Sequence, residues 1–164
     1  WTTKTSSTFG GQGTQGDGTP DDFIKSGGKQ DDGGGSYSNN IKVETWNGTS
    51  WTTLGVGSNF PLSSAYNYGT CCGVGNDSYM MGTNSLSTGD NLIYKFDGSS
   101  WTNSGSATTA PKYVGMGGSS DYAIICGVWQ AGTASSVYNG SSWSTTNALQ
   151  TTRSNSGVGA TTAS

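Results

Sequence analysis

Apolar residues come in short runs separated by glycine and turn residues, and these runs recur along the chain. One run in each group ends in an aromatic residue: IKVETW at 41–46, LIYKF at 92–96 and SSVY at 135–138. In IKVETW, positions 41, 43 and 45 alternate with 42, 44 and 46 as in a strand with two different faces. No run is long enough, or periodic at 3.6 residues, for a helix. The pattern therefore predicts an all-β chain of short strands.

Each of these aromatic residues opens a six-residue motif that closes on Trp: WNGTSW at 46–51, FDGSSW at 96–101 and YNGSSW at 138–143. Asn-Gly or Asp-Gly after an aromatic residue favours a type I′ turn, so the flanking strands should pair antiparallel. The first aromatic residue of the motif varies among Trp, Phe and Tyr, which indicates that this position needs only a bulky ring. The closing Trp is constant, which indicates that it fills a fixed packing position. We therefore interpret the motif as architecture, made by Trp46, Asn47, Gly48, Trp51, Phe96, Asp97, Gly98, Trp101, Tyr138, Asn139, Gly140 and Trp143.

The closing Trp defines a repeat, because Trp1, Trp51, Trp101 and Trp143 lie at intervals of 50, 50 and 42 residues. Each unit holds a Gly-rich stretch, an apolar run ending at Gly, a second apolar run and the motif. Four strands in 42–50 residues is the arithmetic of a β-propeller blade. We expect one repeat domain, 1–164, with units at about 2–51, 52–101 and 102–143 and a partial unit at 144–164. An open β-solenoid or a β-sandwich is the alternative.

The number of units falls short of a closed propeller. Three periods separate Trp1 from Trp143, whereas a propeller usually has four to eight blades. We therefore expect a fragment of a larger propeller whose natural chain continues at both ends, the alternative being that several copies cooperate.

The apolar run that stops at glycine, followed by an aromatic residue and then Trp, resembles the kelch repeat. The likeness is closest to kelch-like blades with an aromatic-Asn-Gly-Ser-Ser-Trp signature, which occur in proteins of marine bacteriophages and environmental bacteria. It covers essentially the whole chain. The kelch double glycine is present at 27–28 and becomes Gly-Thr at 82–83 and Gly-Val at 127–128. The resemblance implies propeller blades of four antiparallel strands and is weak as a guide to function.

The amino-acid composition narrows the classes of partner that this chain is expected to bind. Charged residues make up 10% of the chain, Gly numbers 28, and Ser and Thr together number 49. Soluble domains usually carry about a quarter charged residues, so this surface is polar through hydroxyls rather than charges. The net charge of −3 and the absence of a basic cluster argue against nucleic acid. No run of about 18 apolar residues is present, so we expect no membrane insertion.

Side chains suited to catalysis or metal binding are few in this sequence. The chain has no histidine, which removes the Ser-His-Asp triad and the usual zinc or copper ligand. We therefore expect no enzyme, cofactor or resident metal. Asp17, Asp21 and Asp22 are weak Ca²⁺ candidates, although they lack the spacing of a calcium loop. The cysteines, of which Cys72 and Cys126 could pair, fit better as small buried hydrophobic residues.

Aromatic residues outside the motif are the candidates for ligand binding: Trp129, Phe60 and Tyr37. On loops they could stack on a sugar, although Trp129 could equally pack against an adjacent blade. We expect a non-catalytic structural or adhesive module on a virion surface, such as a phage tail fibre or other surface protein, or in an extracellular assembly. Its partners would be other structural proteins of that assembly, or copies of itself. The alternative is a carbohydrate-binding, lectin-like propeller whose partners are host-surface glycans.

Overall fold

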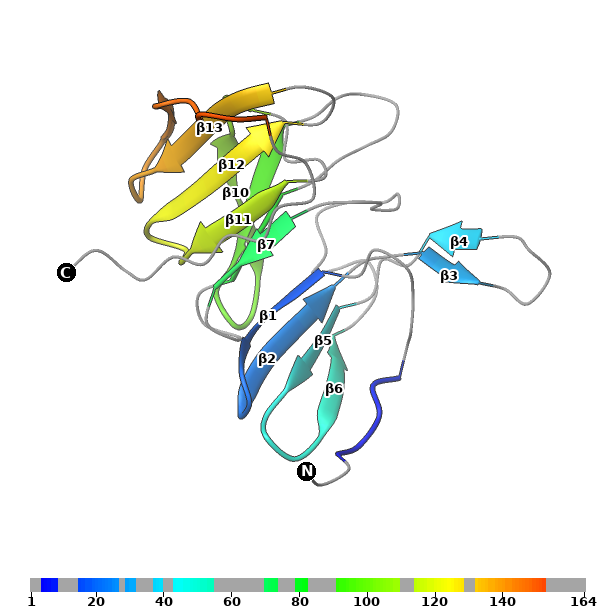
Figure 1. Ribbon diagram of the computed structural model, residues 1–164. Helices are drawn as coiled ribbons and strands as arrows, with labels where there is room; N and C mark the ends of the chain where they lie inside the picture. The colour runs from blue at the N-terminus through cyan, green and yellow to red at the C-terminus, as the bar shows by residue number, and fades with distance from the viewer. Residues whose placement is uncertain are drawn as a thin grey trace.

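The computed structural model describes residues 4–8, 15–26, 29–31, 37–39, 43–54, 70–73, 79–82, 91–109, 114–128 and 132–152. Those residues form antiparallel sheets and contain no helix. Among them there is accordingly no helix long and apolar enough to cross a membrane. The prediction of an all-β chain is therefore confirmed (Figure 1).

Three sheets of four strands each make up the body of the molecule. The first sheet pairs its strands in the order β1 (Gln15–Thr19), β2 (Asp22–Ser26), β5 (Val43–Trp46) and β6 (Trp51–Leu54). The second pairs β7 (Thr70–Cys72), β8 (Tyr79–Gly82), β9 (Leu92–Phe96) and β10 (Trp101–Ser106). The third pairs β11 (Gly115–Gly118), β12 (Ala123–Val128), β13 (Gly132–Tyr138) and β14 (Trp143–Thr146). We call these sheets blade 1, blade 2 and blade 3.

The predicted strands correspond to the observed ones. The Gly-rich stretch gives the first strand, the two apolar runs give the second and third, and the motif Trp begins the fourth. Each blade therefore continues past its Trp, to residues 54, 106 and 146, whereas the units aligned on Trp stop at 51, 101 and 143. A two-stranded hairpin, β3 (Lys29–Asp31) with β4 (Tyr37–Asn39), interrupts blade 1 and was not predicted, because its Gly- and Asp-rich surroundings carry no alternation.

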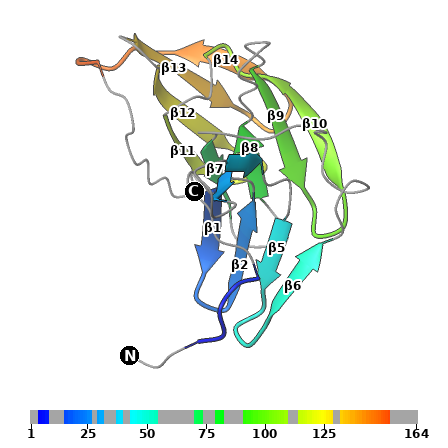
Figure 2. The same ribbon diagram turned by 90° about the vertical axis from the view of Figure 1, so that its right-hand side faces the viewer.

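The blades meet along their first strands. β7 contacts both β1 and β11, so the Gly-rich strands lie together, while β6, β10 and β14 form the outer edges (Figure 2). Asp17 joins two blades directly, since its Oδ2 accepts a hydrogen bond of 3.0 Å from the backbone N–H of Gly73. Glycine is required in these strands: Gly18 has a φ of +141° and Gly118 a φ of +118°, and a Cβ at either would meet the backbone of β2 or β12.

Two apolar clusters lie between neighbouring blades. Ile24 and Val43 of blade 1 pack with Phe96 of blade 2. The larger cluster joins blades 2 and 3 and is built from Cys72, Met80, Ile93, Ala107, Val114, Met116, Ala123, Ile125 and Tyr138. The packing of each blade against the next therefore supplies the described core. Four-stranded sheets packed in this way are β-propeller blades, and the described residues form three of them.

Candidate functional site

The motif residues form three equivalent hairpins with an aromatic pair across each. The register places Trp46 opposite Trp51, and the same pairing recurs in the other two blades. The ring centroids are 5.4, 5.0 and 5.2 Å apart in blades 1, 2 and 3, with interplanar angles of 45°, 40° and 36°. Directly opposed side chains on antiparallel strands stabilise a hairpin, and aromatic pairs do so strongly.

The first ring of each pair is buried, and in two blades it also uses a polar atom. The Trp46 indole Nε1–H donates to the carbonyl of Pro20 at 2.9 Å. The Tyr138 hydroxyl donates to the carbonyl of Gly140 at 2.8 Å. The interpretation that this position needs only bulk is therefore incomplete, because a buried N–H or O–H also needs an acceptor.

The turn between the two aromatics differs from the predicted type I′ turn. In blade 1 the Asn47 N–H donates to the carbonyl of Ser50 at 3.3 Å, which places Gly48 and Thr49 at the centre rather than Asn47 and Gly48. The Asn47 side chain is used instead, since its Oδ1 accepts from the N–H groups of Thr49 and Ser50 at 3.0 and 2.9 Å. Asn139 makes the same pair of bonds in blade 3. The sequence signal was correct about a tight hairpin and wrong about its register.

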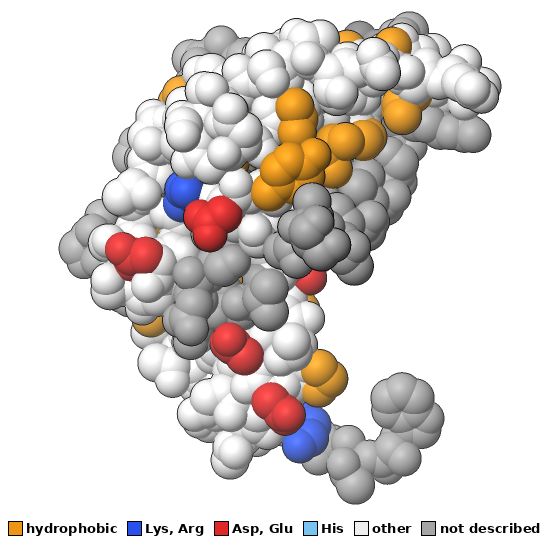
Figure 3. All heavy atoms as spheres, turned by 90° about the vertical axis from the view of Figure 1, so that its left-hand side faces the viewer, with side chains coloured by type: hydrophobic (Ala, Val, Ile, Leu, Met, Phe, Trp, Pro, Cys, Tyr) orange, Lys and Arg blue, Asp and Glu red, His pale blue; other side chains and the backbone are white. Residues whose placement is uncertain are grey.

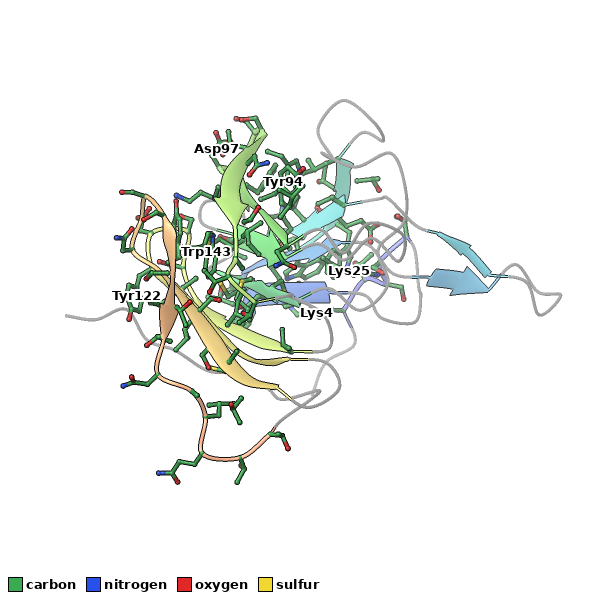
Figure 4. All side chains as sticks on the ribbon, turned by 90° about the horizontal axis from the view of Figure 1, so that it is seen from above. Lys4, Lys25, Tyr94, Asp97, Tyr122 and Trp143 are labelled. Carbon is green, nitrogen blue, oxygen red and sulfur yellow. The ribbon has the colours of Figure 1, made fainter. Side chains whose placement is uncertain are left out.

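Blade 2 carries Asp97 in place of this asparagine. Its carboxylate accepts from the N–H groups of Ser100 and Ser99 at 2.7 and 2.9 Å and from both serine hydroxyls. These bonds favour the ionised carboxylate, so they hold the pKa of Asp97 well below its usual range. Asp97 lies exposed at the tip of the β9–β10 hairpin (Figure 4).

Each blade has two faces with different roles. We call the face with the aromatic pair the leading face and the opposite one the trailing face. The leading face of blade 2 presents Phe96 to Ile24 and Val43 on the trailing face of blade 1. The leading face of blade 3 likewise presents Tyr138 to the apolar side chains of blade 2. Blade 1 has the same leading face, but no described blade lies against it.

A pocket of about 270 Å³ opens on the leading face of blade 1. Its wall is mainly apolar, and the Phe23 ring meets the Trp51 ring edge-on at a centroid distance of 6.3 Å. Lys25 extends over the same Trp51 ring, with its Nζ 5.9 Å from the centroid. The lining residues are Lys4, Thr5, Thr19, Pro20, Phe23, Trp46 and Trp51. Both lysines lie over blade 1 (Figure 4).

The segment 4–8 crosses this face beside the pocket and is fixed by Glu44, which is fully buried. The Glu44 Oε1 accepts from the Thr8 N–H at 2.9 Å and from the Thr8 hydroxyl. Its Oε2 lies 3.7 Å from Lys25 Nζ. Burial is the largest influence on Lys25 and lowers its pKa, while the charge of Glu44 and a hydrogen bond to it oppose that shift. Nearer the N-terminus of the segment, the Trp51 Nε1–H donates to the Thr5 carbonyl at 3.1 Å.

The same crossing recurs on blade 3. The Ser136 hydroxyl bonds the hydroxyls of Thr108 and Thr109 at 2.6 and 2.8 Å. Ser136 lies seven residues before its motif Trp, as Glu44 does, and Thr108 lies seven residues after Trp101, as Thr8 does after Trp1. The segment 4–8 therefore lies on blade 1 as the segment leaving blade 2 lies on blade 3.

The non-motif candidates do not assemble into a site among the described residues. Trp129 and Phe60 lie outside the described residues. Tyr37 belongs to β4, but its side chain is not among those that the structure describes. Asp17, Asp21 and Asp22 do not converge, since the described residues contain no group of three or more His, Cys, Asp and Glu that could hold a metal. Cys72 and Cys126 are not joined by a disulfide. Cys72 packs in the core, where burial raises the pKa of its thiol far above the usual range.

Sequence reasoning missed the pocket on the leading face of blade 1. A signal for it existed, since WTTK at 1–4 repeats WTTL at 51–54 and places the following residues against the next aromatic pair. Glu44 carried no such signal, because the equivalent residues are Tyr94 and Ser136.

Comparison with known proteins supports the fold alone. No family model matches the chain, and no curated protein matches it. Among solved structures, "Structure of YjhT" matches with a TM-score of 0.62 at 10% sequence identity, over 84% of this chain. YjhT is a β-propeller-type structure. The chain spans about half the length of YjhT, 52%.

Proposed function

We propose that this chain is a non-catalytic β-propeller module that makes structural or adhesive contacts in a larger assembly. The observation that carries the proposal is the open leading face of blade 1. It holds the aromatic pair that receives a neighbouring blade elsewhere in the chain, together with a pocket of about 270 Å³. A face that carries the packing aromatic pair of a blade and has no described blade on it fits a protein contact.

A non-catalytic role is also supported by the ionisable groups of this face. Glu44 accepts hydrogen bonds from Thr8 and lies beside Lys25, so both charges are already engaged in holding the fold. Catalytic sites usually combine a nucleophile or base with a shifted pKa in an accessible cleft. Burial raises the pKa of the Cys72 thiol, which shifts this thiol away from reactivity.

The setting we propose is a virion surface, as in a phage tail fibre or other surface protein, or an extracellular assembly. Its support is the hydroxyl-rich, weakly charged composition and the kelch-like motif. The kelch-like assignment is itself part of this proposal. The partners would be other structural proteins of the assembly, copies of the chain, or a host surface.

Carbohydrate binding is the second candidate, and the pocket is the observation that favours it. Phe23, Trp46 and Trp51 present aromatic rings beside Lys4, and such rings can stack on a sugar. We rank it second because the same rings have a packing role in blades 2 and 3, where apolar side chains of the preceding blade lie against them.

Amine cross-linking of the intact assembly, read by mass spectrometry, tests the structural role. Lys4 lines the open pocket, so it should link to another polypeptide or to a second copy. Lys95 is the internal control, because it reaches Asp121 at 3.9 Å and the Tyr138 ring at 5.1 Å within the chain. Links from Lys4 confined to its own chain would contradict the proposal. A glycan array should show no binding; binding that Trp51→Ala abolishes in a folded variant would establish the sugar-binding alternative.

A further inference from the structure

The β3–β4 hairpin projects from blade 1 and belongs to none of the three blades. Among the described strands, β3 (Lys29–Asp31) pairs only with β4 (Tyr37–Asn39). The hairpin stands apart from the blades both in the side view and from above (Figures 1 and 4). The outer edge of β3 therefore has no described strand beside it.

The blade fold does not require this hairpin. It lies in the connection between the second and third strands of blade 1, residues 27–42. Blades 2 and 3 make the same connection with the shorter segments 83–91 and 129–131. A long insertion on a rigid scaffold is typical of a contact surface. An isolated two-stranded ribbon is only marginally stable in water, so this hairpin would be stabilised by a further strand.

The charges of β3 indicate which strand fits its edge. Lys29 and Asp31 are two residues apart, so they hold positions on the same face of the strand. Within the hairpin, the register places uncharged residues of β4, Asn39 and Tyr37, opposite these two positions. Charged residues are only 10% of the chain, and the surface in Figure 3 is mostly uncharged. Two opposite charges within three residues are therefore a distinctive pattern for this protein.

A second β3 strand is complementary to this pattern. When two copies of β3 run antiparallel with Gln30 opposite Gln30, each Lys29 comes opposite the Asp31 of the other copy. Opposite charges at directly opposed positions stabilise a strand pair, and like charges destabilise it. An antiparallel shift by two residues, or an in-register parallel pairing, sets like charges opposite each other. Among these arrangements, only the one centred on Gln30 makes two opposite-charge pairs.

We propose that the edge of β3 binds the same edge of a second copy of this chain, across a two-fold axis at Gln30. The resulting sheet has four strands in the order β4-β3-β3-β4. The proposal names a partner for the proposed structural role and rests on it, but it uses a different surface from the leading face of blade 1. A two-fold contact is closed, so copies associate as pairs rather than filaments.

The contact is expected to be weak by itself. Three-residue strands bury little area, so we expect a dissociation constant on the order of 1 mM. Copies held side by side in one assembly have a high effective concentration, and such a contact can form there.

Cysteine trapping under a mild oxidant tests the geometry. Gln30→Cys places two thiols at the axis, where directly opposed Cα atoms are about 4.5–5.5 Å apart and a disulfide can form. Ser38→Cys is the matched control, because Ser38 lies opposite Gln30 in the hairpin but in β4. Its two copies would be about 14 Å apart across three strand spacings, beyond the reach of a disulfide. We expect a covalent dimer from Gln30→Cys, and only the background of the wild-type cysteines from Ser38→Cys.

Charge reversal tests the register, with NMR of the chain at up to about 1 mM as the measurement. Lys29→Asp or Asp31→Lys alone replaces both opposite-charge pairs by like-charge pairs, so each should weaken self-association roughly 10-fold. An equal mixture of these two variants restores both pairs and should associate as the wild type does. The chain carrying both substitutions should do the same. Ser141→Asp, in an exposed turn of blade 3, is the control for an added charge and should leave association unchanged.

Several results would overturn self-pairing, provided that circular dichroism verifies the fold of each variant. They are trapping from Ser38→Cys as efficient as from Gln30→Cys, single charge variants that associate like the wild type, and a mixture that fails to associate. In the intact assembly, a Gln30→Cys chain that links only to a different polypeptide would also overturn self-pairing and leave the structural role standing. Cross-linking of Lys4 tests the structural role independently.

Discussion

Tyr138 and Trp143 lie directly opposite each other across the β13–β14 hairpin, with ring centroids 5.2 Å apart and planes inclined by 36°. Tyr138 is 3% exposed and belongs to the cluster that joins blades 2 and 3, and Trp143 packs against that cluster from the outer edge. One residue pair therefore stabilises both a hairpin and a contact between blades.

Removing the outer ring of this pair should destabilise the protein. We expect Trp143→Ala to lower the free energy of unfolding by about 3 kcal/mol, because it exposes Tyr138 and leaves a void beside the cluster. Trp143→Phe keeps an aromatic pair and should cost about 1 kcal/mol. Urea denaturation measures both. Equal losses for the two variants would show that the ring pair itself contributes little.

The hydroxyl of Tyr138 should contribute separately from its ring. Tyr138→Phe keeps the ring, as in Phe96 of blade 2, but loses the 2.8 Å bond to the Gly140 carbonyl. We expect a loss of about 1 kcal/mol in the free energy of unfolding. Tyr122→Phe is the matched control, because Tyr122 is 40% exposed, and its unfolding midpoint should not move. A Tyr138→Phe variant as stable as the wild type would exclude this role.

Asp97 should give the β9–β10 turn a pH dependence that the other turns lack. Its folded-state pKa is lowered, first by the Ser100 and then the Ser99 backbone N–H groups. Its stabilising contribution is therefore complete above the unfolded pKa of about 4 and is lost as the pH falls through the lower folded value. Carbon-detected NMR should place its titration midpoint below that of Asp in an unfolded peptide of the same sequence.

The matched variant for this prediction is Asp97→Asn, which copies the residue of blades 1 and 3. It keeps an oxygen acceptor for both N–H groups, so its stability at neutral pH should stay close to that of the wild type. Below about pH 4 the wild type should lose more stability than Asp97→Asn. Parallel acid-unfolding curves for the two proteins would argue against a role for the ionised carboxylate.

Glu44 should control the segment 4–8. Glu44→Ala removes the acceptor of the Thr8 N–H, so the Thr8 amide should exchange with deuterium more than 10-fold faster. Glu44→Gln retains an oxygen at the same reach and should preserve most of the protection. The amides of β13 in blade 3 provide the internal reference. Unchanged Thr8 exchange in Glu44→Ala would mean that the segment is held by other contacts.

Local pattern was enough to predict the strands of the three blades and the antiparallel pairing across each motif turn, and the repeat of that pattern predicted their grouping into blades, whereas the β3–β4 hairpin was not predicted. The alternation in 41–46 and the Asn-Gly or Asp-Gly before each closing Trp act over a few residues, so they can be interpreted without knowing what lies beside them. The exact turn register was not predictable in this way, because the Asn47 side chain competes with the backbone for the Ser50 N–H.

The sequence by itself determined that this is an all-β repeat chain in which two aromatic residues flank the turn between the third and fourth strands of each blade. Only the tertiary structure decided which faces are covered. Ile24 and Ile124 have the same side chain and the same register position, yet one is enclosed and the other is partly exposed. The physical reason is that burial on a blade face depends on the neighbouring blade, which comes from residues far away in the chain. The six-residue motif thus forms a hairpin in each of the three described blades, and only in blade 1 does no described blade lie against its aromatic pair.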